Sequence, residues 1–322
     1  MDREKRHILY NLDERDHSLK GLWLLALLYF GSLFAATLLS LAAWRITHYL
    51  DPEATGYLAN KPYPRFFDRS RWLCVLLLLP YLFWQCRISS FKAVGFAKPI
   101  LSTIGLWFAY GIGMIVIIYG GSFALGAIQL RPEASFSNAL GNIDDAILAG
   151  IAIGLLEEIV FRGLVFRMFY TAIAPISAII ASSAFFAVLH FRASPNELGA
   201  IAPGDVGIAE GLSIAWETIA SLVTQFDFTY LAAIFLVGIL LHQTFLLKGN
   251  LWACASLHAG WVFTIKLVSS SFQTSELANE FTGTTRVADG YWVIIVLAIF
   301  IGLFAKLLAS QGNSQSNSLT ES

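Results

Sequence analysis

Long apolar runs constrain the fold of this chain more than any other feature of its sequence. Several of these runs approach or exceed the ~20 residues that an α-helix needs to cross the hydrocarbon core of a bilayer. Charged residues make up 13% of the 322 residues, against about 25% in soluble domains. The sequence therefore predicts an integral membrane protein of the all-α class, a polytopic bundle of about eight transmembrane helices.

The apolar runs and the polar stretches between them divide the chain. The expected spans are residues 21–46, 72–84, 100–127, 146–170, 175–191, 228–247, 251–268 and 291–308. The corresponding regions are a polar N-terminal segment (1–20), N-terminal transmembrane helices (21–145), a core (146–268), a C-terminal loop and helix (269–309) and a disordered tail (310–322). Residues 208–226 mix apolar and polar side chains at helical spacing, which is typical of a helix on the membrane surface.

The fourth apolar run contains ionisable residues. Glu157, Glu158 and Arg162 lie between Ala146 and Tyr170. A charged side chain at the bilayer centre costs ~2.5–3.5 kcal/mol on insertion scales, so such residues are rare and usually functional. On a helix, Glu158 and Arg162 are one turn apart and can pair. Glu157 points about 100° away from Glu158, towards a different surface of the helix. A buried ion pair that only orients helices is the alternative interpretation.

Two histidines on later spans complete a set of residues suited to hydrolysis. His190 ends the fifth span, and His258 lies within the seventh. A carboxylate with an imidazole can activate a water, while a second group stabilises the oxyanion that forms. The same residue types can also form a zinc site with two His, one Glu and an open position for water. An isolated intramembrane His, such as His242, is interpreted as a helix-packing residue.

Three motifs together carry a family resemblance. They are Glu157-Glu158-x-x-x-Arg162, Phe186-x-x-x-His190, and His258 on a later span. This combination resembles the CPBP family, the CAAX-processing and bacteriocin-processing intramembrane proteases also called Abi proteins, which are related to the Ras-converting prenyl-protein endopeptidases. The resemblance covers about residues 146–268 and identifies them as the catalytic core. The segments Phe161-Arg162-Gly163 and His258-Ala259-Gly260-Trp261 are similar to those of its bacterial members. This similarity implies a location in a bacterial inner (cytoplasmic) membrane.

The resemblance implies a role for each catalytic residue. Glu157 would activate the attacking water together with His190. His258 would help to bind the oxyanion or would share in a metal site. If a metal is used, Glu157, His190 and His258 would be its ligands, and zinc is the metal expected.

The resemblance also implies supporting residues. Glu158 and Arg162 would form a supporting ion pair, and Phe186 would wall the pocket. One position departs from the family pattern, because Val262 stands where the third motif often has Asn or Asp. An oxyanion donor or a metal ligand is therefore either missing or supplied from elsewhere in the chain.

These residues lead to one main function and two alternatives. The main hypothesis is an intramembrane endopeptidase that cleaves a membrane-associated protein or peptide, by CAAX-type or C-terminal-anchor processing, through a Glu/His-activated water with or without a metal. The alternatives are an ion-coupled transporter, since buried Glu, Arg and His suit a proton relay, and a non-catalytic membrane immunity or scaffold protein. The expected partners are the lipid bilayer and a substrate near it, and the net charge of −1 gives no support for nucleic acid.

Overall fold

The computed structural model describes residues 15–49, 56–85, 88, 90–134, 141, 143–190, 203–224 and 226–320. The chain forms two compact units. The first unit comprises residues 1–15, 88–190 and 227–322, and the second comprises residues 16–87 and 191–226. All of the predicted site residues belong to the first unit.

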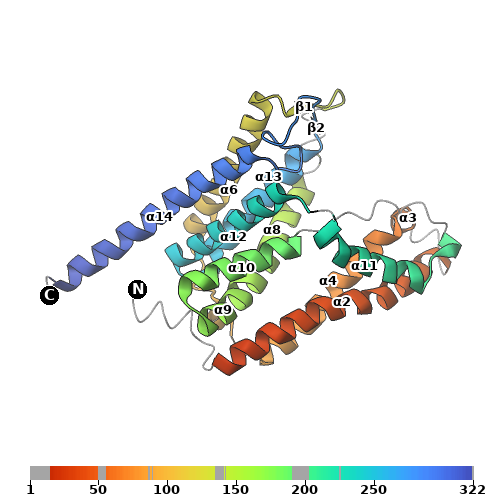
Figure 1. The fold of residues 1–322 in the computed structure, drawn as a ribbon, viewed down its shortest axis with the longest axis horizontal. Coiled ribbons are helices and arrows are strands. Elements are labelled where there is room, and N and C mark those ends of the chain that lie inside the picture. Colours follow the sequence, from red (N-terminus) through yellow and green to blue (C-terminus); the bar gives the residue numbers. More distant parts are fainter. Residues whose placement is uncertain are drawn as a thin grey trace. The chain divides into compact units, whose positions relative to one another are not determined.

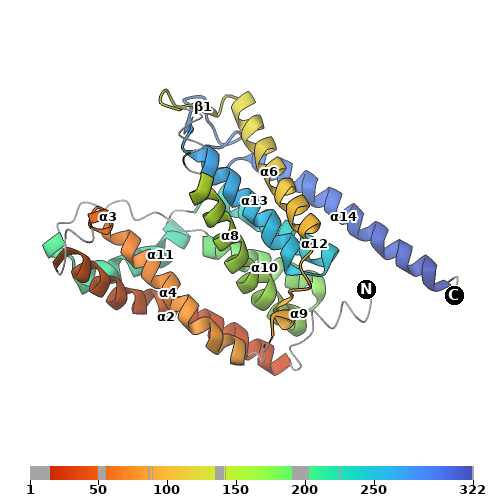
Figure 2. The same cartoon turned by 180° about the vertical axis from the view of Figure 1, so that it is seen from behind.

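The first unit is a bundle of helices (Figure 1). Its helical elements are α5 (Phe91–Val94), α6 (Leu101–Ala124), α8 (Ile143–Val160), the π-helical turn η1 (Phe161–Val165), α9 (Phe166–Ala172), α10 (Pro175–His190), α12 (Phe228–Lys248), α13 (Leu251–Ser269) and α14 (Tyr291–Thr320). Helix α13 packs against both α6 and α8, which are its neighbours in Figure 2. Helix α12 packs against α10 and α14. This arrangement brings the fourth, fifth and seventh predicted spans into one bundle.

Glycines allow α13 to approach its neighbours closely. A Cβ atom at Gly154 on α8 would lie 2.8 Å from the backbone nitrogen of Ala259 and 2.9 Å from the carbonyl oxygen of Ala255, both on α13. On the α6 side, a Cβ atom at Gly260 would lie 3.1 Å from the Cα atom of Gly111. Small residues at such positions let membrane helices pack backbone against backbone. Helix α13 is therefore held between α6 and α8 with little freedom to shift.

A small antiparallel strand pair is an addition to the all-α prediction. Strand β1 (Ile128–Leu130) pairs with β2 (Phe272–Thr274), with Gln129 opposite Gln273. The pair connects the segment that follows α6 to the segment that follows α13. Because it lies outside the predicted apolar spans, hydrophobicity along the sequence gave no signal for it.

The second unit contains helices of its own. They are α2 (Arg15–Tyr49), α3 (Gly56–Ala59), α4 (Tyr63–Gln85), the short 3₁₀ turn η3 (Pro203–Asp205) and α11 (Ile208–Thr224). Its core includes Leu33 from α2, Phe67 from α4 and Ile214 from α11. Helix α11 forms in the stretch that was predicted from its helical spacing to be amphipathic.

The membrane-helix prediction is confirmed in class but not in number. Among the described residues, five helices are long and apolar enough to cross a membrane, at residues 20–49, 101–124, 228–248, 251–269 and 291–311, and α10 is a shorter apolar helix. The expected count of eight is not confirmed. One reason is that α8, in the fourth run, is only 18 residues long and contains four acidic residues, Asp144, Asp145, Glu157 and Glu158.

Two boundaries differ from the sequence-based expectation. Helix α4 begins at Tyr63 rather than Trp72, and Pro64 lies in its first turn, where the missing N–H of proline has no intrahelical partner to lose. Helix α14 continues to Thr320, although a disordered tail was expected from residue 310. A helix that is already formed adds residues without a further nucleation cost, which favours this continuation.

Candidate active site

Three predicted site residues from different helices meet in the first unit. Glu157 lies on α8, His190 is the last residue of α10, and His258 lies on α13. The Oε2 atom of Glu157 is 3.1 Å from Nε2 of His190 and 3.9 Å from Nε2 of His258. The three side chains are 11%, 27% and 9% exposed, respectively. One carboxylate oxygen thus faces two imidazole nitrogens in a mostly enclosed place.

Hydrogen bonds at the opposite ring nitrogens fix how the two imidazoles are oriented. The Nδ1 atom of His190 lies 2.8 Å from the carbonyl oxygen of Phe186, one helical turn earlier. A carbonyl only accepts, so Nδ1 of His190 carries a proton and donates it. Because Nε2 of His190 and Oε2 of Glu157 are then both acceptors in their basic forms, a proton must lie between them to make their contact a hydrogen bond. Glu157 and His190 are therefore a proton-sharing pair.

The adjacent carboxylate, Glu158, orients the second histidine. Its Oε1 atom lies 3.0 Å from Nδ1 of His258 and 2.9 Å from Nη1 of Arg162. The side chains of Glu158 and Arg162 are both 0% exposed, so the predicted pairing is a buried ion pair. Buried ions repay their desolvation only when further hydrogen bonds satisfy them. Here the second bond, to His258, turns that ring so that its Nε2 atom faces Glu157.

Arg162 also anchors the site to α12. Its Nη2 atom donates to the carbonyl oxygen of Gly238 at 3.1 Å. The same carbonyl accepts from Nδ1 of His242 at 2.6 Å, and Nε2 of His242 lies 3.2 Å from the hydroxyl of Ser182 on α10. A chain of hydrogen bonds therefore runs from α10 through α12 to α8 and α13. The sequence suggested His242 only as a packing residue and gave no sign of the Gly238 carbonyl, because every residue has one.

A π-helical turn carries Arg162. Residues Phe161–Val165 form this wide turn directly after α8. A Cβ atom at Gly163 would lie 2.6 Å from Cγ1 and 3.0 Å from the carbonyl oxygen of Val94, so α5 presses closely against the turn. Such π-bulges occur frequently at functional sites. The turn was not predicted, because a single glycine, Gly163, within a long apolar run is not by itself a signal for a π-helical turn.

Aromatic rings line the His190 side of the site. The Phe186 ring lies 4.1 Å from the His190 ring, and the edge of Phe161 contacts Phe186 at 4.7 Å between centroids. The guanidinium carbon of Arg162 lies 4.9 Å from the centre of the Phe186 ring. Phe186 therefore packs against both His190 and Arg162, a position that suits its expected role as a wall. The sequence gave no reason to single out Tyr230. In the structure its hydroxyl donates to the carbonyl oxygen of His190 at 3.4 Å.

The sequence raised two questions about this site: whether another group replaces the polar residue missing at Val262, and whether the site holds zinc. Val262, one turn after His258 on α13, offers no polar side-chain atom where Asn or Asp is usual, and it is half-buried. Within the described ranges, no group of three or more His, Cys, Asp or Glu residues has an arrangement that could hold a metal ion. The zinc site formed by Glu157, His190 and His258 therefore stays a prediction.

The first unit is thus a membrane-type helix bundle with a mostly buried carboxylate–imidazole pair, an arrangement suited to hydrolysis within a membrane. Residues 140–264 match the family model described as type II CAAX prenyl endopeptidase, Rce1-like. Residues 140–264 thus form a domain of the CAAX-protease (CPBP) type, and this segment contains all six of the predicted site residues. No curated protein and no solved structure matches the chain.

Proposed function

We propose that this protein hydrolyses a peptide bond of a membrane-associated substrate with a water activated by Glu157 and His190. The observation that carries the proposal is the 3.1 Å contact between Oε2 of Glu157 and Nε2 of His190, with Nε2 of His258 3.9 Å from the same oxygen. General acid–base catalysis needs such groups within hydrogen-bond reach of one another or of one water. The family match supports a protease over a carrier or a scaffold.

In this mechanism Glu157 is the general base. Its Oε2 atom shares a proton with His190, and its other carboxylate oxygen accepts a proton from the attacking water. The water oxygen bonds to the carbonyl carbon of the scissile peptide, and the electron pair of the C=O bond moves to the carbonyl oxygen. The electron pair on the oxyanion then re-forms the C=O bond as the C–N bond breaks, and Glu157 transfers the proton to the departing amine nitrogen. His190 keeps the carboxylate oriented because its own Nδ1 is fixed to the Phe186 carbonyl.

His258 supplies the donor to the oxyanion. Its Nδ1 donates to the buried carboxylate of Glu158, which holds the ring with Nε2 towards Glu157. A protonated His258 presents an N–H at Nε2, on the side that faces Glu157. Preorganised donors of this kind stabilise the charge that develops on the carbonyl oxygen in the transition state. In this proposal His258 provides the polar group that Val262 lacks.

A zinc-assisted form of the reaction is the second candidate. Both histidines direct Nε2 towards Glu157 while Nδ1 donates to an oxygen, which is the usual hydrogen bonding of metal-binding histidines. A bound zinc would polarise the peptide carbonyl and lower the pKa of the attacking water. The residues that would hold the zinc are Glu157, His190 and His258, which are also the residues that act in the metal-free form. A measurement of the metal content of the purified protein would therefore distinguish the zinc-assisted reaction from the metal-free one.

The substrate class that we propose is a protein or peptide held at the membrane, processed at a CAAX-type C-terminus or a C-terminal anchor. A bacterial inner membrane is the proposed location. The test uses the full chain in liposomes with a prenylated CAAX peptide and its unprenylated counterpart. We expect cleavage by the wild type and a loss of about 10²–10⁴-fold in Glu157→Gln.

A matched control makes this test specific. Glu276 is exposed, and Glu276→Gln removes one negative charge from the same protein without touching the site. It should cleave at the wild-type rate. Cleavage by folded Glu157→Gln at the wild-type rate would overturn the proposed function.

A further inference from the structure

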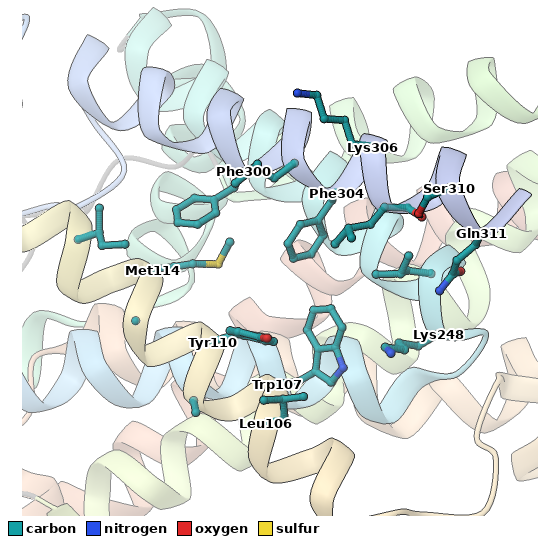
Figure 3. Close-up of a pocket in the computed structure, with 16 residues that line it drawn as sticks. Leu106, Trp107, Tyr110, Met114, Lys248, Phe300, Phe304, Lys306, Ser310 and Gln311 are labelled. Atoms are coloured by element: carbon teal, nitrogen blue, oxygen red, sulfur yellow. The ribbon is translucent and has the colours of Figure 1, made fainter. Parts of the chain in front are cut away.

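A groove in the first unit lies apart from the active site, between α6 and α14 and beside the end of α12 (Figure 3). Its volume is about 690 Å³, which is within the usual range for small-ligand sites. None of the six predicted site residues lines it. The groove therefore needs an explanation of its own.

Two contacts between α6 and α14 frame the groove. The Trp292 indole on α14 donates to the carbonyl of Ile118 on α6 at 3.3 Å. Further along, Trp107 on α6 meets Phe304 on α14 edge to face, with 5.7 Å between the ring centroids. The groove wall includes apolar residues of the intervening turns, such as Met114. The result is an apolar channel that follows the two helices.

One end of the groove is polar. Lys248, Ser310 and Gln311 line this end together with the apolar residues (Figure 3). Lys248 is the last residue of α12, and Ser310 and Gln311 begin the polar run that follows the apolar part of α14. Two membrane-crossing segments thus end together at this point, so the polar end lies at the level where the bilayer meets water. The apolar part then extends from this interface towards the middle of the membrane.

The polar end has donors that lack partners. Lys248 is exposed, and its amine forms no ion pair with any residue in the described part of the chain. Its Nζ atom lies 5.8 Å from the centre of the Trp107 ring. The indole nitrogen of Trp107 is buried and has no hydrogen-bond partner among the described residues. Lys306 also lines the groove, but its amine points away from the groove in Figure 3.

We propose that this groove binds an anionic phospholipid, with its phosphate at Lys248 and one acyl chain along the channel between α6 and α14. The apolar lining accounts for the chain, and the unpaired amine at the interface accounts for the negative headgroup. A basic residue near an anionic membrane surface contributes enough for about a fivefold preference over a lipid without net charge. This proposal concerns binding and does not depend on the proteolytic activity.

The test measures lipid retained by the full-length protein in detergent micelles. Native mass spectrometry would follow titration with phosphatidylglycerol or with phosphatidylcholine of identical acyl chains. We expect one phosphatidylglycerol to be retained with about a fivefold preference. Lys248→Gln should remove the preference while chain binding persists. Lys306→Gln, which removes a neighbouring charge, should keep it.

A second variant tests the channel itself. Gly113 lines the groove, and a Cβ atom there would meet no other atom within 4 Å, so Gly113→Leu fills the channel without disturbing the packing. It should retain neither lipid, whereas Gly105→Leu, on the same helix with equally open space, should behave as the wild type. Equal retention of both lipids by the wild type, or wild-type retention by folded Gly113→Leu, would overturn the proposal. Displacement of the phospholipid by a prenylated peptide at equal concentration would also overturn it and assign the groove to the substrate.

Discussion

Nδ1 of His258 and Oε1 of Glu158 lie 3.0 Å apart, although the two residues come from different helices and are separated by 100 positions. The two neighbouring glutamates therefore have different surroundings. Glu157 faces the imidazole nitrogens that would take part in chemistry, whereas Glu158 is fully buried against Arg162. The same substitution at these adjacent positions should therefore have different effects.

The first prediction compares Glu157→Gln with Glu158→Gln. Glu158→Gln leaves the buried Arg162 without its counter-charge, and breaking a buried ion pair on one side costs about 3–5 kcal/mol of stability. Glu157→Gln should unfold close to the wild-type denaturant concentration and yet be inactive. Unfolding curves in mixed micelles would measure the stability of both variants, and a cleavage assay would measure their activity. Equal stability of the two variants would contradict the assigned difference.

The second prediction concerns His258. In His258→Asn the amide nitrogen can still donate to Glu158, but no group replaces Nε2. We expect the folded variant to lose about 10²–10³-fold in kcat, the usual cost of removing a donor to the oxyanion, with a small change in KM. Steady-state kinetics would show this. A loss confined to KM would mean that His258 binds substrate rather than stabilising the transition state.

The third prediction concerns His242, which we expect to hold the Gly238 carbonyl in place. His242→Leu leaves the Ser182 hydroxyl unsatisfied and removes one donor to that carbonyl, which should cost about 1–3 kcal/mol of stability. His242→Asn, which can still reach the carbonyl, should recover part of this loss. Ser182→Ala is the control and should cost less, because it leaves the bond to Gly238 intact. Equal unfolding free energies for the Leu and Asn variants would argue against this bond.

The fourth prediction concerns the closeness of α10 and α12. A Cβ atom at Gly238 would lie 2.9 Å from Cβ and 3.0 Å from Cα of Ser183, so Gly238→Ala must push the two helices apart. Since His190 ends α10, we expect lower activity as well as lower stability, by roughly 1–3 kcal/mol. Thermal unfolding and cleavage rates would test this. Gly105→Ala, in open space on α6, should change neither.

The fifth prediction concerns metal. If Glu157 and His190 act without one, dialysis against a strong chelator leaves the cleavage rate unchanged, and elemental analysis finds no stoichiometric zinc. Zinc at one atom per chain that is lost from both Glu157→Gln and His258→Ala, with activity lost in parallel, would instead establish the zinc-assisted form. The two variants serve as controls for adventitious binding elsewhere.

The sequence predicted the components of the site better than their connections. Helical spacing alone was sufficient for the Glu158–Arg162 pair, because residues four apart share a helix face. The motifs identified Glu157, His190 and His258 as candidate site residues, and the structure places these three side chains together. The link from Arg162 to Gly238 had no such signal, since it uses a backbone carbonyl that no residue type marks. His242 was seen only as an isolated histidine because its partners are distant in sequence.

The number of membrane-crossing helices was less predictable than the class of fold. Apolar length shows that a segment prefers the membrane but does not show whether its backbone is one continuous helix. In the fourth run, close packing of Val94 against Gly163 accompanies the wide turn, and that contact depends on the tertiary structure. The strands β1 and β2 escaped prediction for a related reason, as each is three residues long and gains its hydrogen bonds only from the other.

The wide turn at Phe161–Val165 has a consequence for how one apolar run serves two partners. A helix turns by about 100° per residue, so each extra residue within a turn rotates everything after it by that amount. Helix α8 packs on α13 while α9 packs on α10. The turn thus acts as a phase shift between them. Helix α8 ends at Val160, the turn that follows holds Arg162, and α9 can then present a different side to α10.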